Sequence, residues 1–183
     1  MTTFAPDTPL GRLVAAQMRA GRLEWIGLRP SRHAEMTTPV EATLVAQTGI
    51  VGDRYRTSRN GTRQVTLIAA EDLAAISAFL GRDAVAPELL RRNLVTRGIN
   101  LIALKGQRFR IGTAVLEGSG DCAPCSQMEE TFGLGGYNAV RGRGGITARI
   151  LESGTVRVGD AVERIQEGLL RSAPLTREFV DVS

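Results

Sequence analysis

Residues 145–165 read GITARILESGTVRVGDAVERI, and this stretch decides the fold class. Apolar and β-branched residues alternate with polar ones in three short segments, which is typical of strands. Ser153 and Gly154 predict a hairpin turn between strands at 145–152 and 155–158, and Gly159 and Asp160 predict another turn before a last strand at 161–165. This part of the chain is therefore predicted to form compact β units.

Short strands and glycine turns continue toward the N-terminus. Strands are predicted at 22–28, 40–46, 64–69, 93–96, 108–111 and 113–117, helices at 9–20, 71–80 and 87–92, and a loop at 118–125. Strands dominate and do not alternate with helices, which predicts a mostly-β, barrel-like fold with a few peripheral α-helices and disfavours a Rossmann sheet. We expect a helical extension at 1–21, one domain at 22–165 and a tail at 166–183.

The composition is that of an ordinary soluble globular protein, because 43% of the 183 residues are hydrophobic and 23% are charged. No apolar run approaches the length of a membrane span. The first 21 residues lack the basic start and the long apolar stretch of a signal peptide. We therefore expect a cytoplasmic protein with no membrane partner.

Arginine supplies all but one of the 23 basic residues, and the exception is Lys105. The planar guanidinium group binds phosphate and carboxylate groups through paired hydrogen bonds. The compositional bias of a GC-rich genome is an alternative explanation of this preference. No nucleic-acid partner is expected, because there is no long basic run and aromatic residues, which stack on bases, make up only 4% of the chain.

Cys122 and Cys125 frame the sequence Cys-Ala-Pro-Cys, between a predicted strand and a possible helix start. A helix start and nearby arginines favour a reactive thiolate. The alternatives are two small buried side chains or a reversible disulfide. A thioredoxin-like fold is disfavoured, because its CxxC motif follows an early strand within βαβ units. With His33 the cysteines would supply at most three ligands, so a closed zinc site is not expected.

Three arginine-containing segments are candidate anion-binding sites. They are the loop 49–63 with Arg54 and Arg63, the segment 88–93 with Arg92 and Asn93, and the segment 137–145 with Arg141 and Arg143. Arginines on glycine-rich loops form anion cradles, and glycines allow a ligand to approach the backbone closely. Each segment also has a simpler interpretation: a solvated loop, a helix end where cations are favoured anyway, or a flexible connection.

Several other chemistries lack their motifs. The chain has no GxxxxGK[ST] sequence and no GxGxxG after a predicted strand, so the common nucleotide-binding motifs are missing. It has no nucleophile-elbow sequence that could work with His33, which we interpret as a surface loop residue.

Taken together and in order, these segments resemble the MOSC domain, named for the C-terminal part of molybdenum-cofactor sulfurases. The matching pieces are RLEWIGL at 22–28, GIVGDRYR at 49–56, RQVTLIAAEDL at 63–73, PELLRRNLVTRGINLIALKGQRFRIGTAVLEGSGDCAPC at 87–125 and GRGGITARILESGTVRVGDAV at 142–162. The order of GDR, ELLRRN, the cysteine and the closing hairpin is more specific than any one piece.

The resemblance implies a β-barrel-like fold and a small-molecule cofactor, the molybdenum cofactor (molybdopterin). In the family, one late cysteine is associated with molybdenum ligation or with a carried sulfane sulfur, and Cys125 occupies the matching place, with Cys122 as an accessory cysteine. The resemblance also implies that Arg92, Asn93, Arg54 and Arg63 meet the pterin phosphate, and Arg141 and Arg143 are further cofactor-binding candidates. A thiolate is a soft ligand that suits a metal–sulfur centre.

The chain departs from the large family members, which carry a pyridoxal-phosphate desulfurase domain. A pyridoxal Schiff base needs a lysine, and Lys105 has no recognisable context, so pyridoxal phosphate is not expected on this chain. Two cysteines cannot bind an iron–sulfur cluster in the usual way, so a reductase of this kind would need an external electron donor.

Three functions stay open at this point. The first possibility is a small oxidoreductase that acts on N-hydroxylated compounds, with molybdenum on Cys125 and electrons from a donor protein. Alternatively, it is a transfer module that carries the cofactor, or a Cys125 persulfide supplied by a sulfur-donor protein. The third possibility is a non-catalytic anion-binding barrel. We favour the oxidoreductase, because no sulfur source is fused to the domain.

Overall fold

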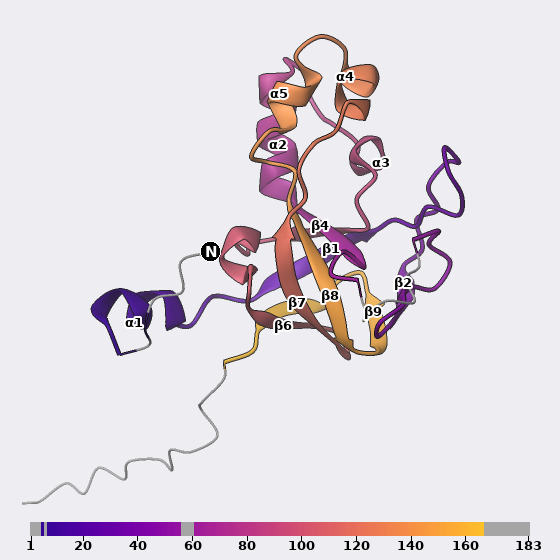
Figure 1. Cartoon of the computed structure of the whole chain (residues 1–183). Coiled ribbons are helices and arrows are strands. Elements are labelled where there is room, and N and C mark those ends of the chain that lie inside the picture. The colour runs from indigo at the N-terminus through magenta and orange to yellow at the C-terminus, as the bar shows by residue number, and fades with distance from the viewer. Residues whose placement is uncertain (1–4, 6, 56–60, 167–183) are drawn as a thin grey trace, which may run out of the picture.

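A computed structural model describes residues 5, 7–55 and 61–166, and within them seven strands close into a barrel (Figure 1). Around the barrel they follow in the order β1 (Gly21–Ile26), β10 (Ala161–Arg164), β6 (Arg108–Ile111), β7 (Ala114–Asp121), β8 (Ile146–Glu152), β4 (Val65–Ala69) and β5 (Leu94–Arg97), which pairs with β1. A small sheet beside the barrel contains, in order, β3 (Gly49–Ile50), β2 (Glu41–Val45) and β9 (Gly154–Arg157). The predicted mostly-β, barrel-like fold is confirmed.

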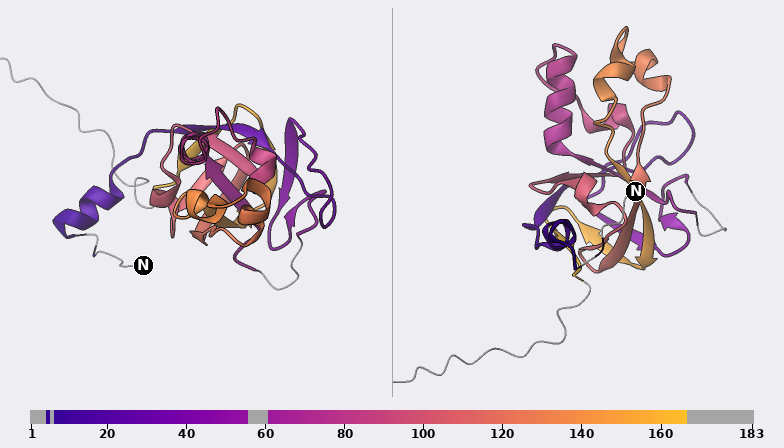
Figure 2. Two further views of the ribbon diagram at one scale, coloured as in Figure 1. Left: turned by 90° about the horizontal axis from the view of Figure 1, so that it is seen from above. Right: turned by 60° about the vertical axis from the view of Figure 1, so that its left-hand side comes forward.

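The helices lie outside the barrel. Four of the described helices stand over one end of it (Figures 1 and 2): α2 (Ala70–Phe79), α3 (Pro87–Leu90), α4 (Gln127–Phe132) and α5 (Gly136–Val140). The 3-10 helix η1 (Leu101–Leu104) packs against the barrel wall, and α1 (Pro9–Ala15) projects away from it. The helices are peripheral, as predicted.

Two apolar cores share the strands β4 and β5. Successive side chains of a strand point to opposite faces, so Leu67 and Leu94 fill the barrel interior while Ile68 and Val95 face the helices. β4 and β5 run parallel and are connected by α2 and α3, whereas the other strand pairs of the barrel are antiparallel. This crossover brings the residues before β5 next to the start of β4.

The predicted hairpin between 145–152 and 155–158 is wrong. β8 pairs with β7 on one edge and with β4 on the other, so it has no free edge for β9. The chain leaves the barrel at Gly154, where an added Cβ atom would lie 2.5 Å from the backbone nitrogen of Ala114. β9 then pairs antiparallel with β2, which is more than 100 residues earlier in the sequence.

The loop predicted at 118–125 begins only after Asp121. Gly118 and Gly120 of β7 pair with Ala148 and Thr147 of β8, with a register shift between the two glycines. The extension of β7 leads the chain directly to Cys122 at the helical end of the barrel.

Two predicted helices are shorter than expected. α1 ends at Ala15, because the backbone leaves the helical conformation at Ala16, and Arg164 of β10 donates a hydrogen bond to the carbonyl of Val14. α3 ends at Leu90, because Arg91 adopts a left-handed conformation with a φ of 53°.

The barrel strands run from β1, which begins at Gly21, to β10, which ends at Arg164. Apart from residue 166, the expected tail lies outside the described residues. None of the helices in the described ranges is long and apolar enough to cross a membrane.

Replacement of Leu67 by alanine tests the barrel core. The side chain is fully buried (0% exposed), so we expect the free energy of unfolding to fall by about 2–5 kcal/mol. Leu134→Ala is the matched control, because the Leu134 side chain is fully exposed (101%) and its truncation should change the free energy by less than about 0.5 kcal/mol. Urea unfolding followed by circular dichroism measures both variants. Equal destabilisation would contradict this core.

Candidate functional site

Asn93 lies at the centre of a buried polar network at the start of β5. Its side chain is fully buried (0% exposed), and its Nδ2 donates hydrogen bonds to Oδ2 of Asp53 at 3.0 Å and to the carbonyl of Gly27 at 3.1 Å. Its Oδ1 accepts hydrogen bonds from the backbone N–H and the hydroxyl of Thr66. These bonds connect the end of β1, the turn after β3 and the first residues of β4.

Arg29 completes this network from the segment that follows β1. Its Nε and Nη2 donate to the two carboxylate oxygens of Asp53, each at 3.0 Å, and its backbone N–H donates to Oδ2 at 2.9 Å. Nη2 also donates to Oδ1 of Asn93 at 3.1 Å, and Nη1 donates to the carbonyl of Arg91 at 3.4 Å. A two-pronged pair of this kind fixes the orientation of both side chains.

Asp53 is ionised within this network. Burial raises its pKa, but hydrogen bonds from the side chain and backbone of Arg29 and from the backbone N–H of Tyr55, together with the charge of Arg29, outweigh burial. The pKa of Asp53 therefore lies below its ordinary value.

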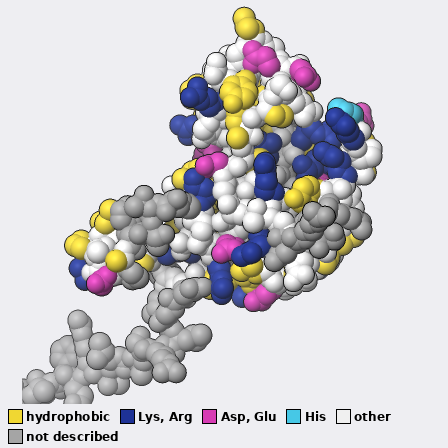
Figure 3. Space-filling model, in the orientation of Figure 1, with side chains coloured by type: hydrophobic (Ala, Val, Ile, Leu, Met, Phe, Trp, Pro, Cys, Tyr) yellow, Lys and Arg dark blue, Asp and Glu magenta, His cyan; other side chains and the backbone are white. Residues whose placement is uncertain are grey.

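Five arginines gather around this network, and we call Arg29, Arg54, Arg63, Arg91 and Arg92 the arginine cluster. Burial lowers the pKa of Arg91, and the neighbouring charges of Arg29 and Arg54 lower it further. Arg91 also donates a hydrogen bond to the carbonyl of Ala34 at 3.0 Å, which fixes the cluster to the loop before β2. Figure 3 shows basic side chains concentrated beside the single histidine on this face.

The arginine cluster carries excess positive charge. Among the described residues, Asp53 is the one carboxylate that hydrogen-bonds to any of the five guanidinium groups, and it is already occupied by Arg29, Asn93 and Tyr55. Arg54 and Arg63 are exposed. Guanidinium groups held this close repel one another, so an anion bound between them would relieve that repulsion.

Arg92 holds the cysteine segment in place. It is buried, and its side chain donates hydrogen bonds to the carbonyls of Gly144 at 2.8 Å, Leu90 at 2.7 Å and Cys122 at 3.3 Å. Burial lowers the pKa of Arg92, and negative charge on Cys122 or Cys125 opposes this effect. The guanidinium group of Arg92 is therefore close to both cysteines.

The two cysteines are free thiols with different surroundings. Cys122 is buried, and its backbone N–H donates to the carbonyl of Gly145 at 2.9 Å, whereas Cys125 is exposed between β7 and α4. Gly144 touches the cysteine segment directly, because an added Cβ atom would lie 2.2 Å from the carbonyl oxygen of Cys122. A soft, accessible sulfur of Cys125 thus lies next to the arginine cluster.

Residues 42–163 match the family model described as MOSC domain. The chain belongs to the MOSC domain family.

Solved structures share the fold of this MOSC domain. The YuaD protein from Bacillus subtilis superposes with a TM-score of 0.70 at 19% identity, over 80% of this chain and 96% of YuaD. YiiM from Geobacillus stearothermophilus has a TM-score of 0.64 at 15% identity, over 81% of this chain and 77% of that protein. YiiM from Escherichia coli has a TM-score of 0.61 at 19% identity, over 80% of this chain and 70% of that protein. These likenesses show the shared fold. A comparison with curated proteins found no significant match.

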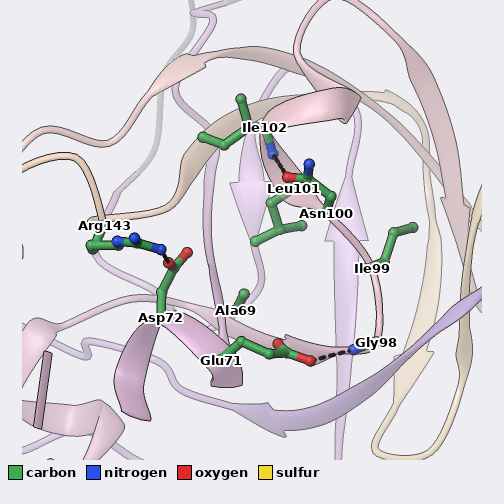
Figure 4. A pocket seen from close by; sticks show the side chains of 9 residues that line it. All are labelled: Ala69, Glu71, Asp72, Gly98, Ile99, Asn100, Leu101, Ile102 and Arg143. Carbon is green, nitrogen blue, oxygen red and sulfur yellow. Dashed lines mark hydrogen bonds and ion pairs between the residues drawn. The ribbon is translucent and has the colours of Figure 1, made fainter. Parts of the chain in front are cut away.

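Two other predicted cofactor-binding residues of this MOSC domain, Arg143 and Arg141, form no side-chain bond with the arginine cluster among the described residues. Nη1 of Arg143 pairs with Oδ1 of Asp72 at 3.2 Å and borders a cavity of about 350 Å³ between the start of α2 and η1 (Figure 4). Leu101 and Ile102 also line this cavity (Figure 4). Arg141 is exposed at the end of α5, and within the described residues no side-chain bond connects it to the cluster.

The sequence interpretation missed Arg29, Arg91 and Asp53. Arg29 follows the first predicted strand and directly precedes Pro30. A proline at this position indicates only that the strand ends, so the sequence carried no signal for a functional role of Arg29. Asp53 belongs to the GDR sequence, and Arg91 precedes Arg92 in ELLRRN, so both lay inside quoted motifs. Asn93, predicted to meet the cofactor, uses its side chain within the protein, and its direct role as a ligand stays a prediction.

The pH dependence of unfolding tests the pair of Asp53 and Arg29. Because the pKa of Asp53 is lowered from 3.8, its carboxylate stabilises the fold above that pH, and this contribution is lost as the pH falls through the lowered pKa. Asp53→Asn leaves Arg29 without a charged partner, so we expect a loss of about 3 kcal/mol at neutral pH. The difference from the wild type should shrink in acid.

Asp121→Asn is the control for this measurement. Asp121 pairs with Lys105 but its side chain is largely exposed, so its loss should change the free energy by less than about 1 kcal/mol. Urea titrations at neutral and acid pH measure all three proteins. A penalty of Asp53→Asn that stays constant with pH would disprove the ionised pair.

Proposed function

We propose that this MOSC domain binds the molybdenum cofactor, with Cys125 as the protein ligand of molybdenum and the arginine cluster as the phosphate site. The observation that carries the proposal is the exposed thiol of Cys125 near Arg92, in an arginine cluster of which only Arg29 pairs with a carboxylate among the described residues. A thiolate is a soft ligand for a metal–sulfur centre, and arginine forks match phosphate oxygens. One domain therefore offers a thiolate ligand for the metal and guanidinium groups for the phosphate of this cofactor.

The donor set also fits the way in which the cofactor supplies ligands. Among the described residues, no three His, Cys, Asp or Glu side chains gather as a metal site. A metal bound by Cys125 would thus take its other ligands from a cofactor, as the dithiolene of molybdopterin allows. When bound, the cofactor would supply a redox-active metal for two-electron chemistry.

Some residues of the site would contact the cofactor, and others hold those residues in position. Arg54 and Arg63 are exposed and available for the phosphate, and Arg91 is partly exposed beside them. Asp53 and Asn93 hold the Arg29 side chain. Arg29 in turn holds the backbone of two neighbours, because it donates to the carbonyl of Arg91 and its own carbonyl accepts a hydrogen bond from the N–H of Arg54 at 2.7 Å. Arg92 fixes Cys122, three residues before Cys125, through its carbonyl.

The reaction class that we propose is the reduction of N-hydroxylated small molecules with electrons from an external donor protein. The exposed sulfur of Cys125 can be reached by a small-molecule substrate from solvent. The alternative function, a carrier of sulfane sulfur on Cys125, rests on the same exposed thiol. Molybdenum analysis and labile-sulfur analysis separate the two functions.

Metal analysis of the chain made in a cofactor-producing host tests the proposal. We expect nearly stoichiometric molybdenum in the wild type and a large loss in Cys125→Ser, because a hydroxyl is a harder and weaker ligand than a thiolate. Cys122→Ser should keep most of the metal, since Cys122 is buried. Labile sulfur on Cys125 without molybdenum would favour the carrier. Absence of both would leave only the non-catalytic barrel.

Cofactor retention by Arg54→Ala tests the phosphate site. Loss of a charge-assisted contact of about 1.5 kcal/mol should weaken retention about tenfold, more at low salt than at high salt. Arg12→Ala is the matched control, because Arg12 is an exposed arginine on α1. Retention after gel filtration at two salt concentrations, measured as molybdenum per chain, reports the effect. Equal retention by both variants would remove Arg54 from the site.

A further inference from the structure

The two cysteines differ in their access to solvent. Cys122 is buried, and its backbone is fixed on both sides by the carbonyl of Gly145 and the side chain of Arg92. Cys125 is exposed in the segment that leads to α4. A reagent in solution can therefore reach the thiol of Cys125, whereas burial shields the thiol of Cys122 from such a reagent.

The spacing of the pair permits a bond between them. Two residues, Ala123 and Pro124, separate the cysteines, so their Cα atoms lie within about 10 Å even in a fully extended chain. A disulfide requires a Cα separation of less than about 7 Å, which needs only a modest bend. Pro124 restricts its own backbone and that of Ala123, which narrows the conformations of the spacer.

A single buried side chain lies close to both cysteines. Arg92 is bound to the carbonyl of Cys122, and negative charge on either Cys122 or Cys125 affects its pKa. Within the described residues, Arg92 hydrogen-bonds to three backbone carbonyls and to no carboxylate. Arg92 therefore anchors the cysteine segment at Cys122, three residues before Cys125.

We infer that Cys122 and Cys125 form a thiol–disulfide switch, in which Cys125 reacts with a low-molecular-weight disulfide and Cys122 closes the internal bond. The switch deepens the proposed function, because a disulfide removes the sulfur of Cys125 from molybdenum. Oxidation would thus prevent cofactor binding, and reduction would restore it.

The exchange balances in two steps. The Cys125 thiolate attacks one sulfur of oxidised glutathione, forms a mixed disulfide and releases one glutathione thiolate, which takes up a proton. The Cys122 sulfur then attacks the sulfur of Cys125, forms the internal disulfide and releases the second glutathione. The protein pair loses two protons and two electrons, and glutathione disulfide gains them as it becomes two glutathione thiols.

Intact mass of the cofactor-free, full-length chain after treatment with oxidised glutathione tests the switch. The wild type should lose the mass of two hydrogens and keep no adduct. Cys122→Ser should keep one glutathione on Cys125, because the resolving thiol is absent. Cys125→Ser should show neither change, because Cys122 is buried. A stable adduct on the wild type, or two free thiols after treatment, would overturn the switch.

A glycine pair provides a second test with both cysteines present. Gly144→Ala places a Cβ atom 2.2 Å from the carbonyl of Cys122 and should displace the resolving thiol, so closure should slow at least several-fold. Gly120→Ala is the control, since its nearest neighbour would be 3.8 Å away. Closure at the same rate in both variants would contradict the anchored position of Cys122.

Molybdenum uptake separates the switch from the function on which it rests. The reduced chain should take up the cofactor, the oxidised chain should take up much less, and a phosphine reductant should restore uptake. Absence of uptake by the reduced chain would overturn the proposed function while the mass result still decides the switch. Equal uptake by both forms would overturn the regulatory consequence.

Discussion

The hydrogen bonds of Asn93 to Asp53, Arg29 and Thr66 hold together the parts from which the site is built. They join the turn after β3, which belongs to the small sheet, to the end of β1 and the start of β4, two strands that pair with β5 in the barrel. A buried amide with all its partners is favourable, whereas the same groups left unpaired would be costly. This network lets the protein keep several guanidinium groups together, because Asp53 neutralises one of them and fixes its position.

The barrel was predictable because its strands have local signals. β4 and β8 carry runs of apolar, β-branched residues, and glycines mark the turns between strands. The partner of β9 was not predictable, because it depends on which edges remain free once β8 lies between β7 and β4. The extent of β7 was also missed, since Gly118 and Gly120 have weak strand preference and pair only because β8 lies beside them.

The grouping of the candidate residues was predictable in part, whereas their roles in binding stay predictions. Cys125, Arg54, Arg63 and Arg92 share one region of the structure, as their order in the motifs implied. The sequence could not separate a ligand from its support, and Arg92, predicted at the phosphate, binds backbone carbonyls. Nor could it show that Arg143 turns toward Asp72, because Gly142 and Gly144 leave the direction of that loop open. Such roles depend on burial and on partners distant in sequence.

The central claim is that the cofactor binds between Cys125 and the arginine cluster. A crystal structure of the cofactor-loaded chain, with anomalous scattering measured at the molybdenum edge, tests it most directly. We predict one anomalous peak at bonding distance from Sγ of Cys125, with the phosphate against Arg54, Arg63 or Arg91. A peak in the cavity beside Arg143, or anywhere away from Cys125, would contradict the account.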